Sequence, residues 1–319
     1  MSKLAFLFPG QASQYSGMGR DLAASFPESR RIFDEADTAL GFPISQLCFE
    51  GSEEALKLTE NTQPAILTVS IAAYRALESR GITPDFAAGH SLGEYSALVA
   101  AGALDFSTAV KVVRGRGRYM QEAVPAGQGA MAAILGLSPA DVAEVCRKAA
   151  DGEVVSSANL NSSEQTVISG SAAAVKRAVE IASQRGAKRA VILPVSAPFH
   201  CALMMPAQER LEPDLRAAQF KPLRFPIVTN VDGEAITTGD DARESLIRQV
   251  TAPVRWFDSV REMIESAVTI FVEVGPGRVL CGLLRQIDRS VRCVNVEDAA
   301  SLQSTLDKIA QARAETPES

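Results

Sequence analysis

The chain has 319 residues, with 38 Asp and Glu, 32 Lys and Arg and a formal net charge of −6. Its 46% hydrophobic and 22% charged residues are typical of a globular protein of about two domains and exclude a disordered or fibrous chain. The acidic balance argues against a nucleic-acid binder, which needs a basic surface. Only two histidines are present, so imidazole chemistry is limited to His90 and His200.

The cysteines and the N-terminus indicate the compartment. Five cysteines are far apart in the sequence and form no C-x-x-C pair, so we expect neither a disulfide framework nor a zinc site, and a reducing environment. The apolar run at the N-terminus stops at Pro9-Gly10, which is too short for a signal peptide. Pro and Gly interrupt the longest uncharged stretches, so no membrane helix is predicted. We expect a cytoplasmic protein.

The first part of the chain predicts alternating strands and helices. Leu4–Phe8 is a short apolar run before Pro-Gly, which predicts a buried strand, and 86–88 predicts a second one. Helices are predicted over residues 29–40, 53–58, 64–79, 94–101 and 106–124. Proline suits the first turn of a helix, so the third of these helices is expected to begin near Pro64.

The segment 126–196 has its own pattern. Strands are predicted over 130–135, 154–160, 166–169 and 189–195, and helices over 138–149 and 172–184. Asn161-Ser162-Ser163 is typical of the turn between the second and third strands. The order β-α-β-β-α-β is that of a ferredoxin-like fold, so we predict an inserted ferredoxin-like subdomain here.

Beyond this segment, the alternation of strands and helices resumes. A hairpin over 226–236 is predicted to turn at Asp232-Gly233. The remaining predictions are helices over 241–249 and 256–266, a strand over 269–274, a helix opened by Gly275-Pro276-Gly277, a strand over 291–296 and a helix to 314. The two flanking parts therefore predict one α/β sheet built from discontinuous sequence, and 315–319 is expected to be a frayed tail.

The strongest chemical motif is Gly89-His90-Ser91-Leu92-Gly93, which matches G-x-S-x-G between a predicted strand and a predicted helix. The glycines permit a sharp turn that leaves the serine hydroxyl at the start of the helix, with the next N–H facing a developing oxyanion. We predict that Ser91 is a nucleophile. The alternative is a serine that only caps the helix.

A serine nucleophile needs a base. His90 lies inside the turn and is expected to point away from the hydroxyl of Ser91, in a structural role. His200 follows Ser196-Ala197-Pro198-Phe199, where the chain returns from the insert to the main sheet, and such junctions are typical places for a site. We therefore predict His200 as the base, the alternative being a buried histidine with a satisfied hydrogen bond.

Several motifs agree in order and spacing with one family. They are Phe8-Pro9-Gly10-Gln11, Thr62-Gln63-Pro64-Ala65, the Ser91 motif, Arg116-Gly117, Phe199-His200, Gln249 and Glu273-Val274-Gly275-Pro276-Gly277. Over residues 4 to 310 the sequence resembles the malonyl-CoA:acyl carrier protein transacylases of the standalone bacterial type. The resemblance implies an α/β fold, with a hydrolase-like parallel-sheet subdomain (1–125 and 197–314) interrupted by the ferredoxin-like one (126–196).

The resemblance also implies the catalytic roles. Ser91 would be the nucleophile and His200 its general base. The main-chain carbonyl of Gln249 would orient His200, in place of a triad carboxylate. The backbone N–H groups of Gln11 and Leu92 would form the oxyanion hole.

Arg116 would hold the free carboxylate of the malonyl group. A planar guanidinium binds a carboxylate through two parallel hydrogen bonds, and an acetyl group offers it no such partner. Arg114 and Arg118 are expected to lie on a solvated helix face. Gln63 and Phe199 are candidates for the pocket lining, and a phenylalanine beside the base resembles the malonyl-selecting members.

The implied reaction is a two-stage transfer of malonyl from malonyl-CoA to the phosphopantetheine thiol of acyl carrier protein, for fatty acid or polyketide synthesis. No bound cofactor or metal, no nucleic-acid or membrane partner, and a monomer are expected. Because carrier proteins are acidic, docking would need a local basic patch, for which Lys188-Arg189, Lys176-Arg177 and Arg285 with Arg289 are candidates. The alternatives are a serine esterase or thioesterase and a carrier-binding scaffold without catalysis.

Overall fold

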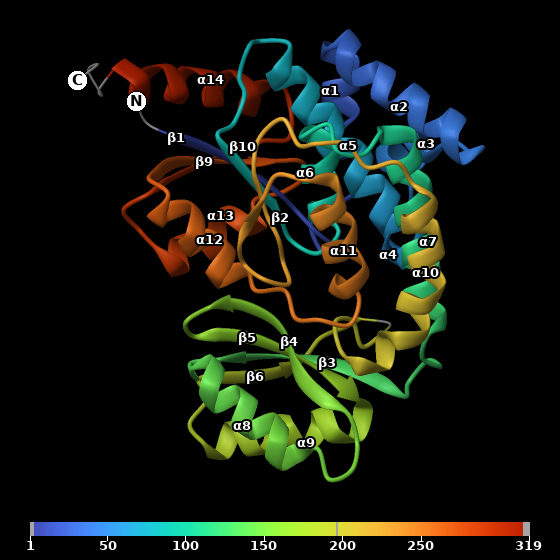
Figure 1. Ribbon diagram of the computed structural model, residues 1–319, viewed down its shortest axis with the longest axis vertical. Helices are drawn as coiled ribbons and strands as arrows, with labels where there is room; N and C mark the ends of the chain where they lie inside the picture. The colour runs from blue at the N-terminus through green and yellow to red at the C-terminus, as the bar shows by residue number, and fades with distance from the viewer. Residues whose placement is uncertain (1–2, 196, 315–319) are drawn as a thin grey trace.

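The computed structural model describes residues 3–195 and 197–314. A six-stranded sheet with the order β10-β9-β1-β2-β7-β8 lies at the centre of the larger part (Figure 1). Its strands are β1 (Lys3–Phe8), β2 (Phe86–Gly89), β7 (Ile227–Val228), β8 (Ala235–Ile236), β9 (Val268–Val274) and β10 (Arg292–Val296). Neighbouring strands pair in parallel except β7 and β8, which form the predicted antiparallel hairpin.

The large sheet is covered on both faces, and its central strand β1 is apolar and buried from Leu4 to Phe8. Leu4, Phe6 and Phe8 of β1 enter one core, and Ala5 and Leu7 enter the other, as the two-residue period of a strand requires. The helices of this part are α1 (Arg20–Ser25), α2 (Pro27–Leu40), α3 (Ile44–Glu50), α4 (Glu53–Lys57), α5 (Thr59–Glu78), α6 (Gly93–Ala100), α7 (Phe106–Glu122), α10 (Met205–Ala217), α11 (Gly239–Gln249), α12 (Trp256–Glu265), α13 (Val279–Ile287) and α14 (Ala299–Ala314). Helices α12 and α13 cover the second core, and α5, α6, α7 and α14 contribute to the first.

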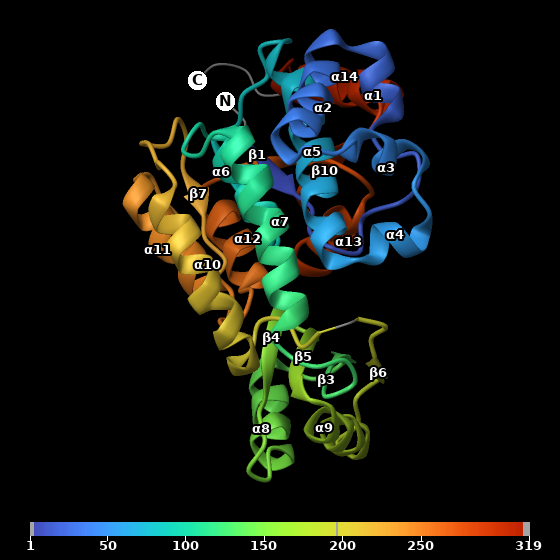
Figure 2. The same cartoon turned by 90° about the vertical axis from the view of Figure 1, so that its right-hand side faces the viewer.

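A four-stranded antiparallel sheet forms the smaller part, in the order β4-β5-β3-β6. Its elements are β3 (Gly129–Leu135), α8 (Pro139–Ala149), β4 (Val155–Ser162), β5 (Gln165–Ser171), α9 (Ala172–Gln184) and β6 (Arg189–Ile192). Figures 1 and 2 show this sheet with α8 and α9 at one end of the molecule and α1, α2 and α14 at the other. The predicted fold class, a parallel-sheet part with an inserted βαββαβ unit, is confirmed. We propose the subdomain boundaries at 125/126 and 196/197. The expected tail, 315–319, lies outside the described residues.

Three element boundaries differ from the predictions. Helix α5 begins at Thr59 rather than near Pro64, because the N–H groups of Asn61 and Thr62 already bond to the carbonyl of Leu58 and form a turn before the proline. Strand β4 runs through the predicted turn as far as Ser162, which pairs with Gln165. Strand β6 ends at Ile192, before the predicted end at Val195; Pro194 has no N–H with which to continue the ladder.

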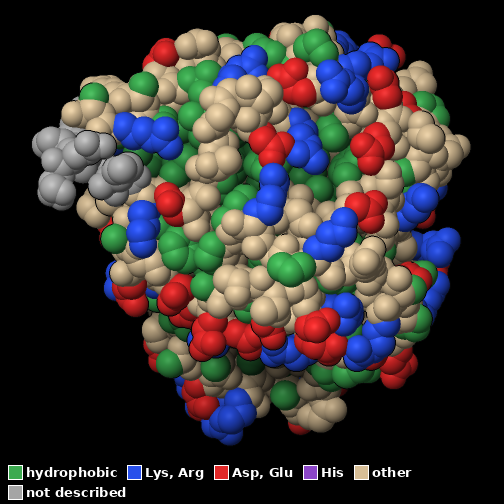
Figure 3. Space-filling view, turned by 45° about the horizontal axis from the view of Figure 1, so that its top comes forward, with side chains coloured by type: hydrophobic (Ala, Val, Ile, Leu, Met, Phe, Trp, Pro, Cys, Tyr) green, Lys and Arg blue, Asp and Glu red, His purple; other side chains and the backbone are tan. Residues whose placement is uncertain are grey.

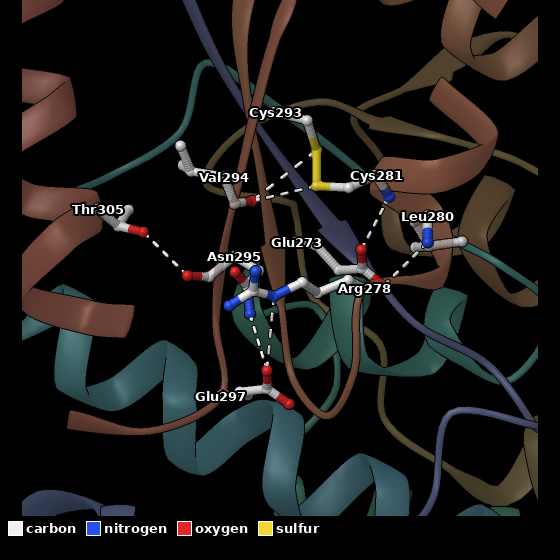
Figure 4. Close-up of a disulfide and its surroundings, with 9 residues drawn as sticks. All are labelled: Glu273, Arg278, Leu280, Cys281, Cys293, Val294, Asn295, Glu297 and Thr305. Carbon is white, nitrogen blue, oxygen red and sulfur yellow. Dashed lines mark hydrogen bonds and ion pairs between the residues drawn. A yellow bond between two sulfur atoms is a disulfide. The ribbon is translucent and has the colours of Figure 1, made fainter. Parts of the chain in front are cut away.

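The structure contains a disulfide between Cys281 and Cys293, so the expectation of a chain without one is wrong for this pair. Helix α13 follows β9 and returns along the sheet to β10, which brings two cysteines separated by 12 residues to a Cα–Cα distance of 5.5 Å (Figure 4). Cys48, Cys146 and Cys201 are free and buried. Within residues 3–195 and 197–314, no helix is long and apolar enough to cross a membrane, and no cluster of three His, Cys, Asp or Glu side chains is placed to hold a metal ion.

Candidate active site

The candidate site lies where two neighbouring parallel strands end. Phe8 of β1 pairs with Gly89 of β2, so the loops that follow these strands lie side by side although about 80 residues separate them. Glycines allow the close approach. A Cβ at Gly10 would lie 2.4 Å from the carbonyl oxygen of His90, and a Cβ at Gly93 would lie 2.0 Å from that of Phe8.

Ser91 occupies the turn between β2 and α6, as the G-x-S-x-G motif predicts. Its φ of +52° places it in the left-handed region, which a residue with a side chain adopts only under constraint from its surroundings. One constraint is visible, because the backbone N–H of Ser91 donates to Oδ1 of Asn230 at 2.7 Å. The turn therefore holds the hydroxyl of Ser91 at the beginning of α6.

His200 lies against Ser91 in the geometry of a base. Its Nε2 is 2.7 Å from Oγ of Ser91, and its Nδ1 is 2.9 Å from the carbonyl oxygen of Gln249. A carbonyl only accepts, so Nδ1 carries the proton and Nε2 accepts from the serine hydroxyl. Burial, followed by the positive charge of Arg116, lowers the pKa of His200 to about 3. The imidazole is therefore neutral near pH 7, the form in which it can accept a proton.

Arg116 is a buried cation beside the serine. Its side chain is 1% exposed, and its two terminal nitrogens donate to Oε1 of Gln63 at 2.8 Å, Oγ of Ser91 at 3.1 Å and Oε1 of Gln249 at 2.9 Å. Its Nε has no hydrogen-bond partner, and no carboxylate pairs with it in the described part of the chain. All its hydrogen bonds go to neutral groups, and the buried carboxylate of Glu94 acts on it only from beyond the side chain of Gln249. A buried guanidinium without an ion-pair partner in contact is unusual, because buried charges are normally paired.

The neighbouring arginines of α7 lie outside the site, although only Arg118 has the solvated position predicted for both. Arg118 is exposed, and Arg114 is half-buried with its guanidinium 4.3 Å from the ring centre of Phe42. Both line a surface groove on the outer side of α7 rather than the site. The helical period separates these two side chains from Arg116, which points inward.

A cavity of about 160 Å³ lies over Ser91, His200 and Arg116. Of the other predicted residues, Gln11, Gln63 and Phe199 line it, whereas Leu92 and Gln249 do not. The backbone N–H groups of Gln11 and Leu92 donate to no protein acceptor among the described residues. Gln249 supports the site from behind, through its main-chain carbonyl and its side chain.

His90 points away from the serine. Its Nε2–H donates to Oδ1 of Asn161 at 3.0 Å, and its ring packs against Trp256 with the ring centres 5.4 Å apart. Burial lowers the pKa of His90, so this ring is neutral too. Within the described residues it makes no hydrogen bond to Ser91, which leaves His200 as the imidazole in contact with the nucleophile.

Sequence reasoning missed two residues that hold the serine turn. Asn230 accepts from the N–H of Ser91, and its Nδ2 donates to the carbonyl of Gly89 at 2.7 Å. Buried Glu94 accepts from the N–H of Asn230 at 3.0 Å and from Nε2 of Gln249 at 2.9 Å. Burial raises the pKa of Glu94. Glu94 could have been found from the sequence, because it is the one charged residue in the otherwise uncharged segment Gly93–Ala100.

Comparison with known proteins shows the family of the chain. Residues 5–312 match the acyl transferase domain family. The malonyl CoA-acyl carrier protein transacylase of Bacillus subtilis (strain 168) is 49% identical over 97% of this chain and 98% of that protein. The transacylase of that name from Clostridium perfringens superimposes with a TM-score of 0.95, at 43% identity over 99% of this chain and 100% of that chain.

A third similar structure is a malonyl-transacylase in complex with a type II polyketide synthase acyl-carrier protein. It has a TM-score of 0.94 and 44% identity, and the match covers 96% of this chain and 100% of that one. The match to the domain family and the identity to full-length relatives each span nearly the whole chain. The chain therefore belongs to the acyl transferase family that includes the malonyl CoA-acyl carrier protein transacylases.

Proposed function

We propose that this acyltransferase moves a malonyl group from malonyl-CoA to the phosphopantetheine thiol of acyl carrier protein, through a malonyl ester on Ser91. The observation that carries the proposal is the unpaired buried guanidinium of Arg116, 3.1 Å from the serine oxygen. An acyl group on Ser91 that ends in a carboxylate would supply the missing partner. Charge-assisted hydrogen bonds of this kind contribute about 1.5–3 kcal/mol each, which selects malonyl over acetyl.

In the first half-reaction, Oγ of Ser91 attacks the thioester carbonyl as its proton passes to Nε2 of His200. The 2.7 Å contact between these atoms supports a direct transfer. The oxyanion of the tetrahedral intermediate would accept from the free N–H groups of Gln11 and Leu92. When the carbon–sulfur bond breaks, CoA leaves as a thiol with the proton from His200, and malonyl-Ser91 remains.

The substrate carboxylate also helps the base. The positive charge of Arg116 is the second cause, after burial, of the low pKa of His200. A malonyl carboxylate bound to Arg116 offsets this charge, so His200 binds the proton of Ser91 more readily in the substrate complex. An acetyl group would leave the charge in place, which adds to the discrimination against it.

The second half-reaction runs in reverse with a new thiol. The phosphopantetheine thiol gives its proton to His200 and attacks the ester carbonyl, and Ser91 takes that proton back as the bond to malonyl breaks. Water competes for the same ester. Apolar side chains of Met120, Met131, Leu193, Val195 and Phe199 line the cavity and disfavour water there. We infer that malonyl-carrier supplies extender units for fatty acid or polyketide synthesis.

A two-step transfer tests the proposal against the esterase alternative. The protein is mixed with malonyl-CoA, freed of CoA by rapid desalting, and divided between buffer alone and buffer with holo acyl carrier protein. We expect malonyl to move onto the carrier much faster than free malonate appears in buffer. Release of malonate at one rate in both samples would favour an esterase. Failure to isolate a malonylated protein would contradict the covalent intermediate.

A further inference from the structure

The disulfide lies in a surface groove of about 580 Å³ between α13, β10 and α14. Cys293 lines this groove and is half-buried, whereas Cys281 is only 8% exposed and does not line it. The two sulfurs therefore differ in their access from the groove, because only the sulfur of Cys293 belongs to a lining residue.

The groove is strongly basic. Its eight lining residues include Arg285, Arg289, Arg292 and Lys308 and no acid. Arg285, Arg289 and Lys308 are exposed and form no ion pair with the described residues. The nearby carboxylate of Asp288 is bonded instead to the N–H and hydroxyl of Ser290. The three exposed cations Arg285, Arg289 and Lys308 attract anions to the sulfur of Cys293.

We propose that Cys281–Cys293 is a site of reversible thiol–disulfide exchange with small anionic thiols, which the basic groove binds beside Cys293. The chemical class is a low-molecular-weight thiol carrying carboxylates, of which glutathione is the probe. Neither the transfer of malonyl nor the cavity over Ser91 uses these two cysteines, so the inference goes beyond the proposed function.

The exchange proceeds in two steps. A thiolate attacks Sγ of Cys293, the bond between the two protein sulfurs breaks, and its electron pair leaves on Sγ of Cys281, which takes a proton from water. A second thiolate then attacks the sulfur of the bound thiol, and Cys293 leaves as a thiolate that takes a proton. Two small thiols are oxidised to one disulfide, and the protein disulfide is reduced to two thiols. Oxidised glutathione drives the sequence in reverse.

The surroundings of Cys281 keep it in place when the bond is open. The carboxylate of buried Glu273 accepts from the N–H of Leu280 at 3.0 Å and from the N–H of Cys281 at 2.8 Å (Figure 4). These bonds hold the first turn of α13 to β9 independently of the disulfide. Cys281 therefore stays near Cys293 after reduction, and the exchange is reversible.

The first experiment asks whether the site exists. The full-length protein is equilibrated with oxidised or with reduced glutathione. It is then unfolded in denaturant containing a maleimide, which labels every free thiol, and its intact mass is measured. Because the chain has five cysteines and two form the disulfide, we expect three labels after oxidation and five after reduction. Five labels under both conditions would overturn the proposal.

The second experiment asks whether the groove selects anionic thiols. Reduction of the oxidised protein is timed with glutathione and with 2-mercaptoethanol, which carries no carboxylate, in wild type, in R285Q/R289Q and in the matched control R31Q/K221Q. The control removes two exposed cations elsewhere, so both variants change the net charge equally. We expect R285Q/R289Q to slow glutathione roughly tenfold and the control to slow it less than about twofold.

Loss of the two groove arginines should slow 2-mercaptoethanol, whose thiolate carries a single charge, much less than glutathione. Added salt should slow glutathione in wild type because exposed charges are screened. Equal effects of the two variants, or equal effects on both thiols, would overturn the proposal. A variant R285Q/R289Q that exchanges normally but has a raised KM for acyl carrier protein would assign the groove to carrier docking instead, which also contradicts it.

Discussion

Ser91 and His200 share an uncommon backbone conformation, with φ values of +52° and +58°. Residues with side chains adopt such values where surrounding contacts hold them, and these contacts fix the direction of the side chain. In Ser91 the contact is the bond from its N–H to Asn230, and in His200 it is the bond from Nδ1 to Gln249. The 2.7 Å contact between the two side chains is therefore preformed without substrate.

The first prediction concerns Arg116. Replacing it with Ala removes the only cation in contact with Ser91 among the described residues, so malonyl transfer should fall by roughly 10- to 100-fold more than acetyl transfer. Arg116→Lys keeps the charge but not the paired geometry and should lie between the two. The measurement is kcat/KM for malonyl-CoA and acetyl-CoA in each protein. Equal losses on both substrates would refute a carboxylate-binding role.

The second prediction concerns pH. Since burial and Arg116 lower the pKa of His200 to about 3, the base stays neutral far below the usual histidine range. The kcat/KM for acylation, which reports the free enzyme, should therefore show no inflection near 6.5, the ordinary histidine pKa. Malonyl-enzyme formation is measured within seconds of a jump to each pH, before the protein has time to unfold in acid. An acid limb with a midpoint near 6.5 would contradict the preformed neutral base.

The same pKa shift of His200 makes the stability of the folded protein depend on pH. An unfolded His200 binds a proton near pH 6.5, whereas the folded one does so only near its pKa of about 3. The folded state therefore loses stability as the pH falls through this window, and the full contribution is present above it. Acid titration of the unfolding midpoint checks this direction.

The third prediction concerns Asn230, which holds the serine turn without lining the cavity. Asn230→Ala leaves the N–H of Ser91 without its acceptor, at a cost of about 1–3 kcal/mol, so kcat should fall about tenfold or more. The KM for malonyl-CoA should change little. Asn295→Ala, another buried asparagine far from the serine, is the control and should leave both constants unchanged. A raised KM with normal kcat would refute a positioning role.

At the scale of elements, periodicity predicted most helices and strands because their apolar faces follow the period of each structure. It did not assign α1, α3 or α10, and it placed the start of α5 too late. The missed contacts share one cause. Asn230 and Glu94 meet through a bond between segments 136 residues apart, and Cys281 meets Cys293 only because α13 returns along the sheet. Local patterns carry no information about such pairings.

The fourth prediction concerns the link between α13 and β10. The disulfide closes a loop across a separation of 12 residues, so the double variant C281S/C293S should lower the free energy of unfolding by about 2–3 kcal/mol relative to the oxidised protein. Urea titration of both proteins without reductant measures this difference. Relative to wild type kept reduced, the variant should differ little. Equal stability of oxidised wild type and variant would show that the link does not constrain the unfolded chain.

At the scale of the whole molecule, the order of strands and helices was sufficient to predict the insert, because a βαββαβ unit can be read from consecutive sequence. The parallel sheet is built from both flanking parts, which the alternation of strands and helices on either side of the insert also predicted; the motif resemblance added its hydrolase-like character. The roles of Ser91 and His200 could be argued from their residue types. That of Gln249 rested on the resemblance alone, since any residue can offer a carbonyl.

The charge of the surface bears on carrier docking. Basic and acidic side chains are interspersed on the face shown in Figure 3, so no large patch of one sign covers it. Among the docking candidates, Lys188 pairs with Glu164 at 2.8 Å and Arg177 with Glu153 at 2.7 Å. These cations are partly neutralised, which weakens both patches as sites for an acidic partner.

The most direct test of the account is the position of the acyl group. Wild-type protein and Ser91→Ala are each mixed with malonyl-CoA, quenched in acid and analysed by intact mass and peptide fragmentation. We expect one malonyl group per wild-type chain, attached to Ser91, and none on the variant. A malonyl group on another residue, or one that persists in Ser91→Ala, would contradict the account.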